Sequence, residues 1–379
     1  MRILHSTLDL DLGGSQRQLR NLVIGSRKSS NVHAVHSMRC RTYTHDMEAA
    51  GVKVFVANAS KWRPWQAFLS LAHAIRAFRP DIIQPWMPQT EIIAGAIGTV
   101  FRLPVIANER NSRVHYLSIE EASKAWFSSV RPLAVKYLSH SAIANSQAGA
   151  SYLRDDIKLK CPIHVIPNGV DLGFIDTQTP ILRSELGFSD TFPLMIAASR
   201  VVPAKRIDLK IRGIAALKKR LILVNLLICG DGSELPSLKD LAQQLGVTDQ
   251  VKFAGAVKNV IPYLKTADLF CTASEVEGLS NSMLEALSCS LPVLATNIPE
   301  HHEVLGESAA GEYFERGSVD GFAQAVESVI PATSKLNERR IAARRIAERY
   351  SLESMCDSFN KYYSAFPLHS KLAPSSATT

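Results

Sequence analysis

The chain has 379 residues, a formal net charge of +8 and a hydrophobic content of 46%. This length corresponds to about two domains. The longest uncharged apolar runs, Ile92–Phe101 and Leu221–Gly230, are half as long as the roughly 20 residues of a membrane-spanning helix. The chain also begins without a secretory apolar segment. These features exclude a membrane-spanning protein, and we expect a cytoplasmic protein that is soluble or peripheral on the cytoplasmic membrane face.

The positive charge is concentrated in the first part of the chain. Residues 1–150 contain 18 lysines and arginines against 9 aspartates and glutamates, whereas the remainder contains 25 against 26. Such a surplus suits a phosphorylated substrate or an anionic membrane, and a solvated surface without a partner is the alternative. We expect no nucleic-acid partner, because the sequence has no basic–aromatic nucleic-acid motif. The six scattered cysteines lack Cys-x-x-Cys spacing and indicate reduced, buried thiols.

Short apolar strands alternate with amphipathic helical segments through most of the chain. In the first half the pattern predicts strands near Arg2–Ser6, Val32–His36, Val52–Val56, Asp81–Trp86, Val105–Asn108, Ala142–Asn145 and His164–Ile166. Helical patterns between them include Gly14–Ser26, Pro64–Phe78 and Ile119–Tyr137. This alternation indicates βαβ units and a parallel sheet.

The turn segment Pro167–Asp171 interrupts this series and predicts a domain boundary. A second series of strands follows at Phe192–Ser199, Leu226–Cys229, Val251–Ala254, Leu269–Thr272 and Pro292–Thr296. We therefore expect an α/β protein with two doubly wound, Rossmann-like domains, over residues 1–170 and 171–350. A C-terminal helix over 351–366 is expected to pack back on the body, and residues 367–379 to form a disordered tail.

Two glutamates, Glu277 and Glu285, flank the expected start of a helix, the second about two turns inside it. Backbone N–H groups at a helix start are unpaired and bind anions. We assign this anion-binding role to Leu279, Ser280, Asn281 and Ser282. Carboxylates beside such a site accept hydrogen bonds from hydroxyl groups. A nucleotide sugar is an anion with hydroxyl-rich groups on both sides, and it would match this arrangement. The alternative is that the two glutamates lie on a solvated helix face.

Other candidate residues follow expected strands, where the ligands of open α/β sheets collect. Arg200 and Lys205 lie on the loop after the first strand of the second domain. There they would hold a diphosphate through a guanidinium fork and a point charge, with a solvated basic loop as the alternative. Gly13 and Gly14 open the first helix and let the backbone approach a phosphate or sugar, although a turn without a ligand explains them equally well.

Gly230 ends the next strand of the second domain. Together with Gly232 it allows a tight turn, and Asp231 or Ser233 is a candidate cap of the helix that follows. A purely structural role is favoured here. Gly230 nevertheless lies at the edge of the sheet where the substrate is expected, and we include it among the substrate-binding residues.

Arg200, Lys205, Glu277, Gly278 and Glu285, in that order, resemble the GT4 family of retaining glycosyltransferases with the GT-B fold. Other similar elements are Phe253–Gly255, Tyr263, Ala267-Asp268, Pro167–Asp171 and the Gly13-Gly14 turn. The resemblance covers nearly the whole chain and is strongest over 165–305. It implies a GT-B fold, in which the two Rossmann-like domains face a central cleft.

The resemblance also implies roles for individual residues. Arg200 and Lys205 would hold the donor diphosphate, and the amides near Leu279–Ser282 and Gly14 would complete the phosphate site. Glu277 would meet the hydroxyls of the donor sugar and Glu285 those of the ribose. The implied reaction is transfer, with retention, from a nucleotide sugar to a glycan or polyprenyl-diphosphate-linked acceptor. Such reactions build surface polysaccharide, lipopolysaccharide or capsule.

The first domain would then bind the acceptor and the second the nucleotide sugar. We expect a UDP-linked donor, with GDP and ADP left open. Trp62, Trp65, Trp86 and Trp126, together with the basic balance of the first domain, suit a lipid-linked acceptor at an anionic membrane. Core positions are the alternative for these tryptophans.

The sequence departs from the family pattern at two places. Many relatives carry a histidine close to the sugar, where this chain reads Asn108-Glu109-Arg110-Asn111. A subset of relatives has Glu-Arg-Asn there, and we assign Arg110 and Asn111 to the substrate site. Ser290 stands where relatives usually have glycine, which we interpret as a tolerated structural change.

We expect no metal and no other cofactor. Asp9-Leu-Asp11 has the spacing of a metal-binding pair, but it precedes the Gly13-Gly14 turn and is interpreted as a loop and capping element. Arg200 and Lys205 supply the positive charge that a divalent ion would otherwise bring. Two other functions remain open, a sugar-nucleotide epimerase of GT-B architecture and a catalytically inactive interaction protein.

Overall fold

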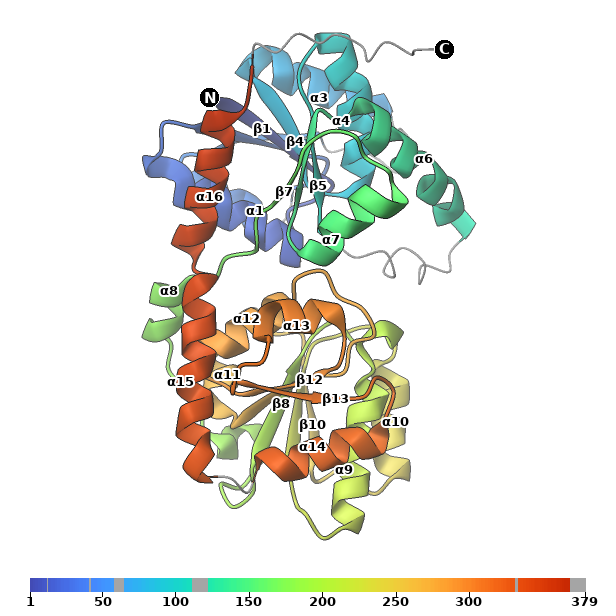
Figure 1. The fold of residues 1–379 in the computed structure, drawn as a ribbon, viewed down its shortest axis with the longest axis vertical. Coiled ribbons are helices and arrows are strands. Elements are labelled where there is room, and N and C mark those ends of the chain that lie inside the picture. Colours follow the sequence, from blue (N-terminus) through green and yellow to red (C-terminus); the bar gives the residue numbers. More distant parts are fainter. Residues whose placement is uncertain (12, 41, 58–64, 111–121, 331–332, 369–379) are drawn as a thin grey trace. The chain divides into compact units, whose positions relative to one another are not determined.

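The computed structural model describes residues 1–11, 13–40, 42–57, 65–110, 122–330 and 333–368, with side chains of 122–129 and 333–334 left out. The chain divides into two compact units (Figure 1). The first unit consists of Met1–Gly169 with Leu352–Thr379, and the second of Val170–Ser351. Both are α/β units with parallel sheets. Within the described residues, none of the helices has the length and apolar character that crossing a membrane requires.

The first unit is built on parallel strands joined by helices. The strands are β1 (Arg2–Thr7), β2 (Val32–Ser37), β3 (Lys53–Val56), β4 (Ile82–Pro85), β5 (Ile106–Glu109), β6 (Ser141–Ala144) and β7 (Ile163–Val165). They are ordered β3-β2-β1-β4 and β5-β6-β7, and a parallel bridge between Ile83 and Val105 links the two groups. The main helices are α1 (Gly14–Gly25), α2 (Thr42–Ala49), α3 (Trp65–Phe78), α4 (Pro88–Phe101), α6 (Ala122–Leu138), α7 (Gln147–Ser151) and α16 (Leu352–Ala365).

Neighbouring side chains of β1 enter opposite cores of the first unit, as the period of two in a strand requires. Ile3 packs in a core with residues of α1, α2 and α16, whereas Leu4 packs with residues of α3 and α4. The aromatic residues of α16, Phe359 and Tyr363, are fully buried in the first of these cores. The C-terminal helix is therefore an integral layer of the first unit.

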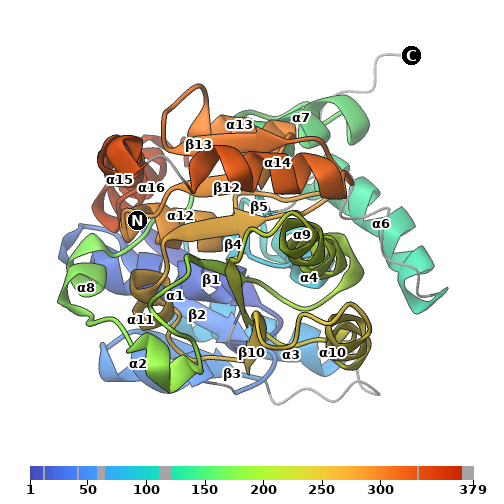
Figure 2. The ribbon, with the colours of Figure 1, turned by 90° about the horizontal axis from the view of Figure 1, so that it is seen from below.

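The second unit repeats the same strand order. Its strands are β8 (Leu194–Ala198), β9 (Asn225–Cys229), β10 (Val251–Gly255), β11 (Leu269–Thr272), β12 (Val293–Thr296) and β13 (Gly311–Phe314), in the order β10-β9-β8-β11-β12-β13. Its main helices are α8 (Leu172–Thr177), α9 (Ile207–Lys219), α10 (Leu235–Gln244), α11 (Ile261–Thr266), α12 (Asn281–Ser288), α13 (Pro299–Leu305), α14 (Val319–Val329) and α15 (Thr333–Arg349). The cores on the two faces of the sheet involve α9, α10 and α14 on one side and α11, α12, α13 and α15 on the other (Figure 2).

The strand order reverses between β8 and β11, which are neighbours in the sheet although β9 and β10 separate them in sequence. At such a switch point the loops after the two strands leave in opposite directions and open a crevice. This place in the second unit is where Arg200, Lys205 and Glu277 follow their strands.

The predicted strands are confirmed with shifts of one or two residues at their ends. Two details were wrong. Neither Asp231 nor Ser233 caps α10, because the helix begins at Leu235 and its N-cap position is Glu234. Glu285 is the fifth residue of α12 and lies little more than one turn inside it, because the helix begins only at Asn281.

Ser290 has a φ of +60° just after α12. This is the left-handed conformation that commonly ends a helix and that glycine adopts without steric cost. Ser290 therefore adopts a backbone conformation that is strained for a residue with a side chain.

A buried ionic triad holds part of the first unit together. Arg131 of α6 contacts Glu91 of α4 at 2.6 Å and Glu109 of β5 at 2.8 Å, with all three side chains at most 2% exposed. Burial raises the pKa of Glu91 although Arg131 opposes this effect. Two carboxylates thus share one guanidinium, and removal of that guanidinium would leave buried charge without compensation.

Replacement of Arg131 by methionine is expected to lower the free energy of unfolding of the first unit by about 3–5 kcal/mol, because it leaves two buried carboxyl groups without their cationic partner. Chemical denaturation followed by circular dichroism measures this loss. The exposed Arg154, changed to methionine, is the control and should stay within about 0.5 kcal/mol of wild type. A loss below about 1 kcal/mol for Arg131→Met would contradict a structural role for the triad.

Candidate active site

An ion pair joins the loops after β8 and β11 at the switch point of the second unit. Lys205 ends a short 3-10 turn (Pro203–Lys205), and its Nζ donates to Glu277 Oε1 at 2.5 Å. The two side chains are 15% and 12% exposed. The structure therefore brings together two of the residues predicted to be catalytic, although 71 residues separate them in sequence.

Two further contacts fasten these loops to one another. The Glu275 backbone N–H donates to the Ala204 carbonyl at 3.0 Å, and Arg206 Nη1 donates to the Glu275 carboxylate at 2.9 Å. Arg206 also binds Asp208 of α9 through two hydrogen bonds. The Lys205–Glu277 pair is thus held in a fixed frame, which pre-organises it for a ligand.

The electrostatic surroundings keep Glu277 ionised. Burial alone would raise the pKa of Glu277, but Lys205, assisted by His301 and Ser274, lowers it below its ordinary value. A buried carboxylate that remains charged needs such partners. Its remaining lone pairs are suited to accept hydrogen bonds from hydroxyl groups.

A polar network that the sequence analysis missed lies behind this carboxylate. Thr272 and Ser274 share a hydroxyl contact at 3.2 Å, and Thr296 Oγ1 donates to the Ser274 carbonyl at 2.9 Å. His301 of α13 is 1% exposed, and its Nδ1 lies 2.8 Å from the Thr296 carbonyl. Since a carbonyl only accepts, Nδ1 carries the proton. These residues are hydroxyls and one histidine on three segments, a pattern without a sequence motif.

Arg200 is exposed on the same loop as Lys205, directly after β8. Within the part of the chain that the structure describes, its guanidinium has no hydrogen bond or ion pair. A cation at this edge of the sheet is available to an anionic ligand, unlike Arg206, whose guanidinium is occupied by Asp208 and Glu275.

Gly230 shapes this loop from the neighbouring strand. It has a φ of +148°, and a Cβ added to it would lie 1.8 Å from the Ser199 carbonyl oxygen. The Ser199 N–H donates to Cys229 in the same region. Gly230 therefore allows the β8 loop to approach β9 closely, which is a structural role; its predicted contact with substrate stays a prediction.

The helix after β11 is arranged largely as an anion site requires. Ser280 is the N-cap of α12, and its side chain accepts from the Met283 N–H at 3.4 Å. Asn281 and Ser282 form the first turn. Leu279 lies before the cap and is buried, so its assignment to the helix start was wrong by two residues. Glu285 is buried at 8% exposure on the same helix.

In the first unit, Gly13 and Gly14 open α1 after β1. Gly13 is the N-cap, and a Cβ there would lie 2.3 Å from Gln16 Oε1. Gln16 in turn donates to Asp9 at 2.9 Å, and Asp9 also accepts from the Asp11 N–H. Asp9 thus serves as a loop element, as its position in the sequence indicated.

Arg110, directly after β5, is buried at 7% exposure and its guanidinium lies 4.2 Å from the Trp86 ring centre. Nη1 donates to Asn168 at 2.8 Å, whereas Nε and Nη2 have no hydrogen-bond partner among the described residues. Burial lowers the pKa of Arg110 to about 9. Asn111, predicted beside it, lies outside the described residues.

Two asparagines at the same edge of the sheet also have polar atoms without a partner in the described part of the chain. They are both side-chain atoms of Asn108, at the end of β5, and Oδ1 of Asn145, after β6. Buried polar groups in proteins are almost always satisfied by protein, water or a ligand. We call Asn108, Arg110 and Asn145 the β5–β6 polar cluster. Its free donors and acceptors fit a hydroxylated or anionic ligand.

The predicted tryptophans differ in their surroundings. Trp86 is 1% exposed and is a core residue, as the alternative interpretation held. Trp65 is 54% exposed at the start of α3. Trp62 and the Trp126 side chain lie outside what the structure describes. Among the described residues, no group of three or more His, Cys, Asp or Glu side chains is placed to hold a metal ion.

Two family descriptions match most of the chain. Residues 12–174 match Glycosyltransferase Family 4, and residues 178–346 match Glycosyl transferases group 1. Among curated relatives, the alpha-monoglucosyldiacylglycerol synthase of Streptococcus pneumoniae is 27% identical over 350 residues, covering 80% of this chain and 77% of that protein. The lipopolysaccharide core biosynthesis glycosyltransferase LpsE of Rhizobium meliloti is 24% identical over 302 residues, covering 79% and 80%.

Solved structures share the fold over nearly the full length. Anabaena Alr3699/HepE in complex with UDP-glucose superposes with a TM-score of 0.82 at 20% identity, covering 97% of this chain and 100% of that one. WaaG, a glycosyltransferase involved in lipopolysaccharide biosynthesis, has a TM-score of 0.76 at 15% identity, covering 96% and 100%. At this level of identity the likeness shows the fold, which is the GT-B fold expected from the sequence.

Replacement of Gly230 by alanine is expected to destabilise the second unit, because the added methyl group would overlap the Ser199 carbonyl. Gly246 is the matched control, since its φ is also positive, at +66°, but a Cβ there meets nothing within 4 Å. We expect Gly246→Ala to cost about 1 kcal/mol and Gly230→Ala at least about twice as much in chemical denaturation. Equal losses for the two variants would contradict the close approach of the loop.

Lys210 of α9 is a buried cation behind the site, only 2% exposed. Burial lowers its pKa to about 8 from the ordinary value of 10.5, with a further lowering contribution from Lys205. Between these two pKa values the unfolded chain binds more protons than the folded one. The contribution of Lys210 to folding stability therefore becomes more favourable as pH rises through this window.

We expect Lys210→Met to raise the melting temperature relative to wild type at pH 7, where the native lysine is charged and desolvated. The difference should shrink as pH rises from about 8 to about 10, because the folded lysine loses its proton there. Melting curves at several pH values measure it. Exposed Lys239, changed to methionine, is the control and should show no such trend. A pH-independent difference for Lys210→Met would contradict the lowered pKa.

Proposed function

Because the chain belongs to the GT4 family of glycosyltransferases, we propose that it transfers a sugar from a UDP-linked donor, with retention of configuration, to a lipid-linked glycan acceptor. The observation that carries this proposal is the Lys205–Glu277 pair at the switch point of the second unit, on the same loop as Arg200, whose guanidinium has no partner among the described residues. This arrangement joins cations for a diphosphate to a carboxylate for sugar hydroxyls within one short stretch of the sheet edge.

The proposed chemistry assigns the positive groups to the leaving nucleotide. As the bond to the anomeric carbon breaks, negative charge grows on the β-phosphate, and Arg200 and Lys205 would stabilise it together with the first-turn amides of α12. These positive groups would stabilise the transition state more strongly than the bound substrate, because the leaving group becomes more negative as the bond breaks. Glu277 would accept hydrogen bonds from the departing sugar, and Glu285 from the ribose.

The donor class is supported by relatives of known structure. Alr3699/HepE has been solved with UDP and with UDP-glucose. The donor diphosphate would make Lys205 share its three N–H donors between Glu277 and phosphate oxygens. Arg200 would bring a free guanidinium, which suits bidentate contact with phosphate.

We assign acceptor binding to the first unit. The β5–β6 polar cluster offers a buried guanidinium with free N–H groups beside amide donors and acceptors. A phosphorylated or hydroxylated acceptor end would satisfy them. The names of two relatives, a glucosyldiacylglycerol synthase and a lipopolysaccharide core glycosyltransferase, support a glycolipid product.

The decisive experiment separates binding from turnover. A thermal-shift screen against UDP, GDP, ADP and their sugar conjugates identifies the donor, which we expect to be UDP-linked. Transfer to glycolipid acceptors is then assayed for Arg200→Ala and Lys205→Ala, each of which should lower turnover about 10²–10³-fold. Arg212→Ala, which removes an exposed cation on α9, is the matched control and should stay near wild type.

The two glutamates should differ in the same assays. Glu277→Gln is expected to lose turnover while it retains nucleotide affinity, whereas Glu285→Gln should lose both. Incubation with donor alone, without acceptor, should give no epimer of the donor sugar. Retention of more than about a tenth of wild-type activity by Lys205→Ala or Arg200→Ala would contradict their assignment to the leaving group.

A further inference from the structure

His301 of α13 is a buried titratable residue behind the candidate active site, and the proposed chemistry leaves it without a role. Its side chain is 1% exposed. Its Nδ1 lies 2.8 Å from the Thr296 carbonyl and carries a proton, because a carbonyl only accepts. Nε2 is buried and has no hydrogen-bond partner among the described residues. A second proton on this ring can therefore bind only at Nε2.

A chain of polar contacts connects this ring to Glu277. Thr296, whose carbonyl binds Nδ1 of the ring, donates through its hydroxyl to the Ser274 carbonyl at 2.9 Å. The Ser274 side chain forms a hydrogen bond with Glu277. The imidazole and the carboxylate therefore belong to one polar network, which spans the loop after β11, the end of β12 and the start of α13.

The charge of the His301 ring depends on groups from three segments. Burial lowers the pKa of His301 below its ordinary value of 6.5, so the ring is neutral at pH 7. Glu277, on the loop after β11, and the hydrogen bond to Thr296 oppose this effect. Lys205, on the loop after β8, and His302, on α13 itself, lower the pKa further. The balance between Lys205 and Glu277 therefore controls how easily the ring takes up a proton.

A bound diphosphate would change this balance. Lys205 Nζ lies 2.5 Å from Glu277 Oε1 and compensates the charge of that carboxylate. Phosphate oxygens that share the Lys205 N–H groups would divide this positive charge between two anions, and the diphosphate would add negative charge to the network. Both changes favour the protonated form of a nearby imidazole. A carboxylate as buried as Glu277 also needs a replacement for the charge that it loses.

We propose that His301 is a positioning residue for Glu277, and that it takes up a proton at Nε2 when the donor diphosphate binds. The imidazolium N–H then holds Glu277 ionised and oriented toward the hydroxyls of the donor sugar. The proton comes from solvent, and no covalent bond of the substrate changes in this step. The inference rests on the proposed function, because it takes Lys205 as part of the phosphate site.

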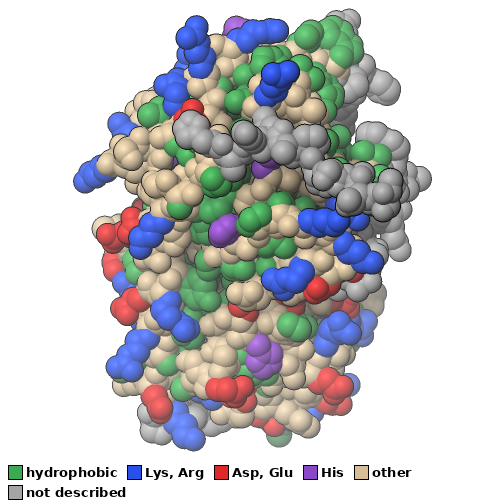
Figure 3. Space-filling view, turned by 45° about the horizontal axis from the view of Figure 1, so that its top comes forward, with side chains coloured by type: hydrophobic (Ala, Val, Ile, Leu, Met, Phe, Trp, Pro, Cys, Tyr) green, Lys and Arg blue, Asp and Glu red, His purple; other side chains and the backbone are tan. Residues whose placement is uncertain are grey.

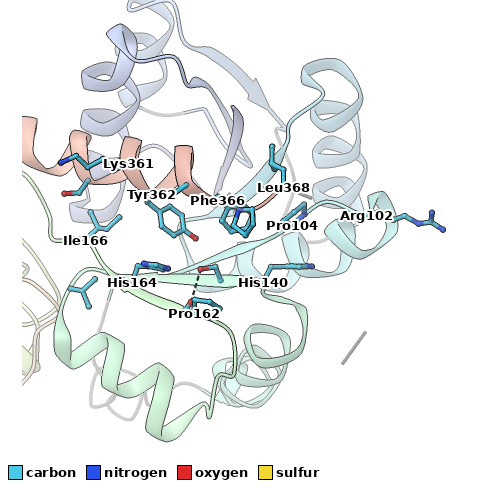
Figure 4. Close-up of a pocket in the computed structure, with 15 residues that line it drawn as sticks. Arg102, Pro104, His140, Pro162, His164, Ile166, Lys361, Tyr362, Phe366 and Leu368 are labelled. Carbon is cyan, nitrogen blue, oxygen red and sulfur yellow. Dashed lines mark hydrogen bonds between the residues drawn. The ribbon is translucent and has the colours of Figure 1, made fainter. Parts of the chain in front are cut away.

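Histidines elsewhere in the chain also contribute to any measured proton uptake. Histidine side chains are visible at the surface on the face drawn in Figure 3. His140 and His164 are exposed and line a cavity of about 980 Å³ in the first unit, where Figure 4 shows them below Tyr362. Substitutions at position 301 leave these histidines in place. A comparison between the wild type and variants of His301 therefore removes their contribution.

Calorimetry of UDP binding to the full chain, in buffers of different ionisation enthalpy, measures the proton uptake. At pH 7 the wild type should take up at least about 0.3 proton per UDP more than His301→Gln, because the glutamine amide does not titrate. The terminal phosphate of UDP, with a pKa of about 6, contributes equally to both proteins. His302→Gln is the matched control, since it removes the neighbouring histidine, which contacts Asn297. This variant should take up as many protons as the wild type.

Two amide substitutions separate a positioning role from a packing role. Glutamine can place its amide nitrogen near the position of Nε2, whereas asparagine can place its nitrogen near Nδ1 and keep only the contact with Thr296. In sugar transfer, His301→Gln should keep kcat within about threefold of wild type. His301→Asn should lower kcat at least about tenfold, which is the effect of one hydrogen bond to a charged group. The wild-type kcat should fall as pH rises through the pKa that His301 has in the complex, and the His301→Gln value should not.

Equal proton uptake by the wild type and His301→Gln would overturn the inference. So would a higher kcat for His301→Asn than for His301→Gln, because the contact with Thr296 would then be the function of the ring. Either result, together with normal binding of UDP and normal transfer by the wild type, would leave the proposed function intact. Absence of a UDP-induced thermal shift in the wild type would contradict the proposed donor and, with it, this inference. All variants should retain that shift, which reports a folded second unit.

Discussion

The Lys205–Glu277 ion pair is the constraint on which the candidate active site depends. It connects the loops after β8 and β11, which are neighbours in the sheet only because the strand order reverses there. With the Glu275–Ala204 hydrogen bond and the Arg206–Glu275 pair, it fixes two loops that would otherwise leave the sheet in opposite directions. A rigid frame of this kind places charge before the ligand arrives, so that little reorganisation is needed during reaction.

The same pair explains how several charges coexist in a small volume. Glu277 is buried but ionised because Lys205 is paired with it, and Lys210 is buried nearby as a second cation. Two lysines against one glutamate leave an excess of positive charge, to which Arg200 adds from the solvent side. A diphosphate would neutralise that excess. The arrangement is costly without a ligand and becomes balanced with one, which favours an anionic substrate over a neutral sugar.

Local patterns in the sequence were sufficient for every strand except β13 and for the presence of a helix after Glu277, although that helix begins two residues later than expected. They depend on short-range alternation, turn residues and caps, which a sequence displays directly. The β8 loop approaches β9 at Gly230, where the sequence favoured a structural role because of a tight turn and did not reveal the close approach of the Ser199 carbonyl. Ser290 was recognised only as a departure from glycine, and its positive φ shows what that departure means for the backbone.

Long-range partners could not be predicted in this way. Lys210 lies in an amphipathic helix, where a lysine is ordinarily a solvated residue, and only the folded unit reveals that it is buried. The sequence does not predict the buried ionic triad, because its members, Arg131, Glu91 and Glu109, lie on three different elements. His301 is adjacent to His302, and nothing in the sequence distinguishes the buried ring from the more exposed one.

The β5–β6 polar cluster of the first unit resembles the site of the second unit in having a positive charge and polar atoms that lack partners among the described residues. Arg110 binds Asn168 through one nitrogen, while its two other guanidinium nitrogens lack partners among the described residues. Asn168 precedes Gly169, whose N–H and carbonyl are both bound by the Gln18 side chain. An anion that takes the free N–H groups of Arg110 would therefore bind the same side chain that holds the last residues of the unit's first segment. Substrate binding in this unit and the conformation of residues 168–169 would therefore both depend on the Arg110 guanidinium.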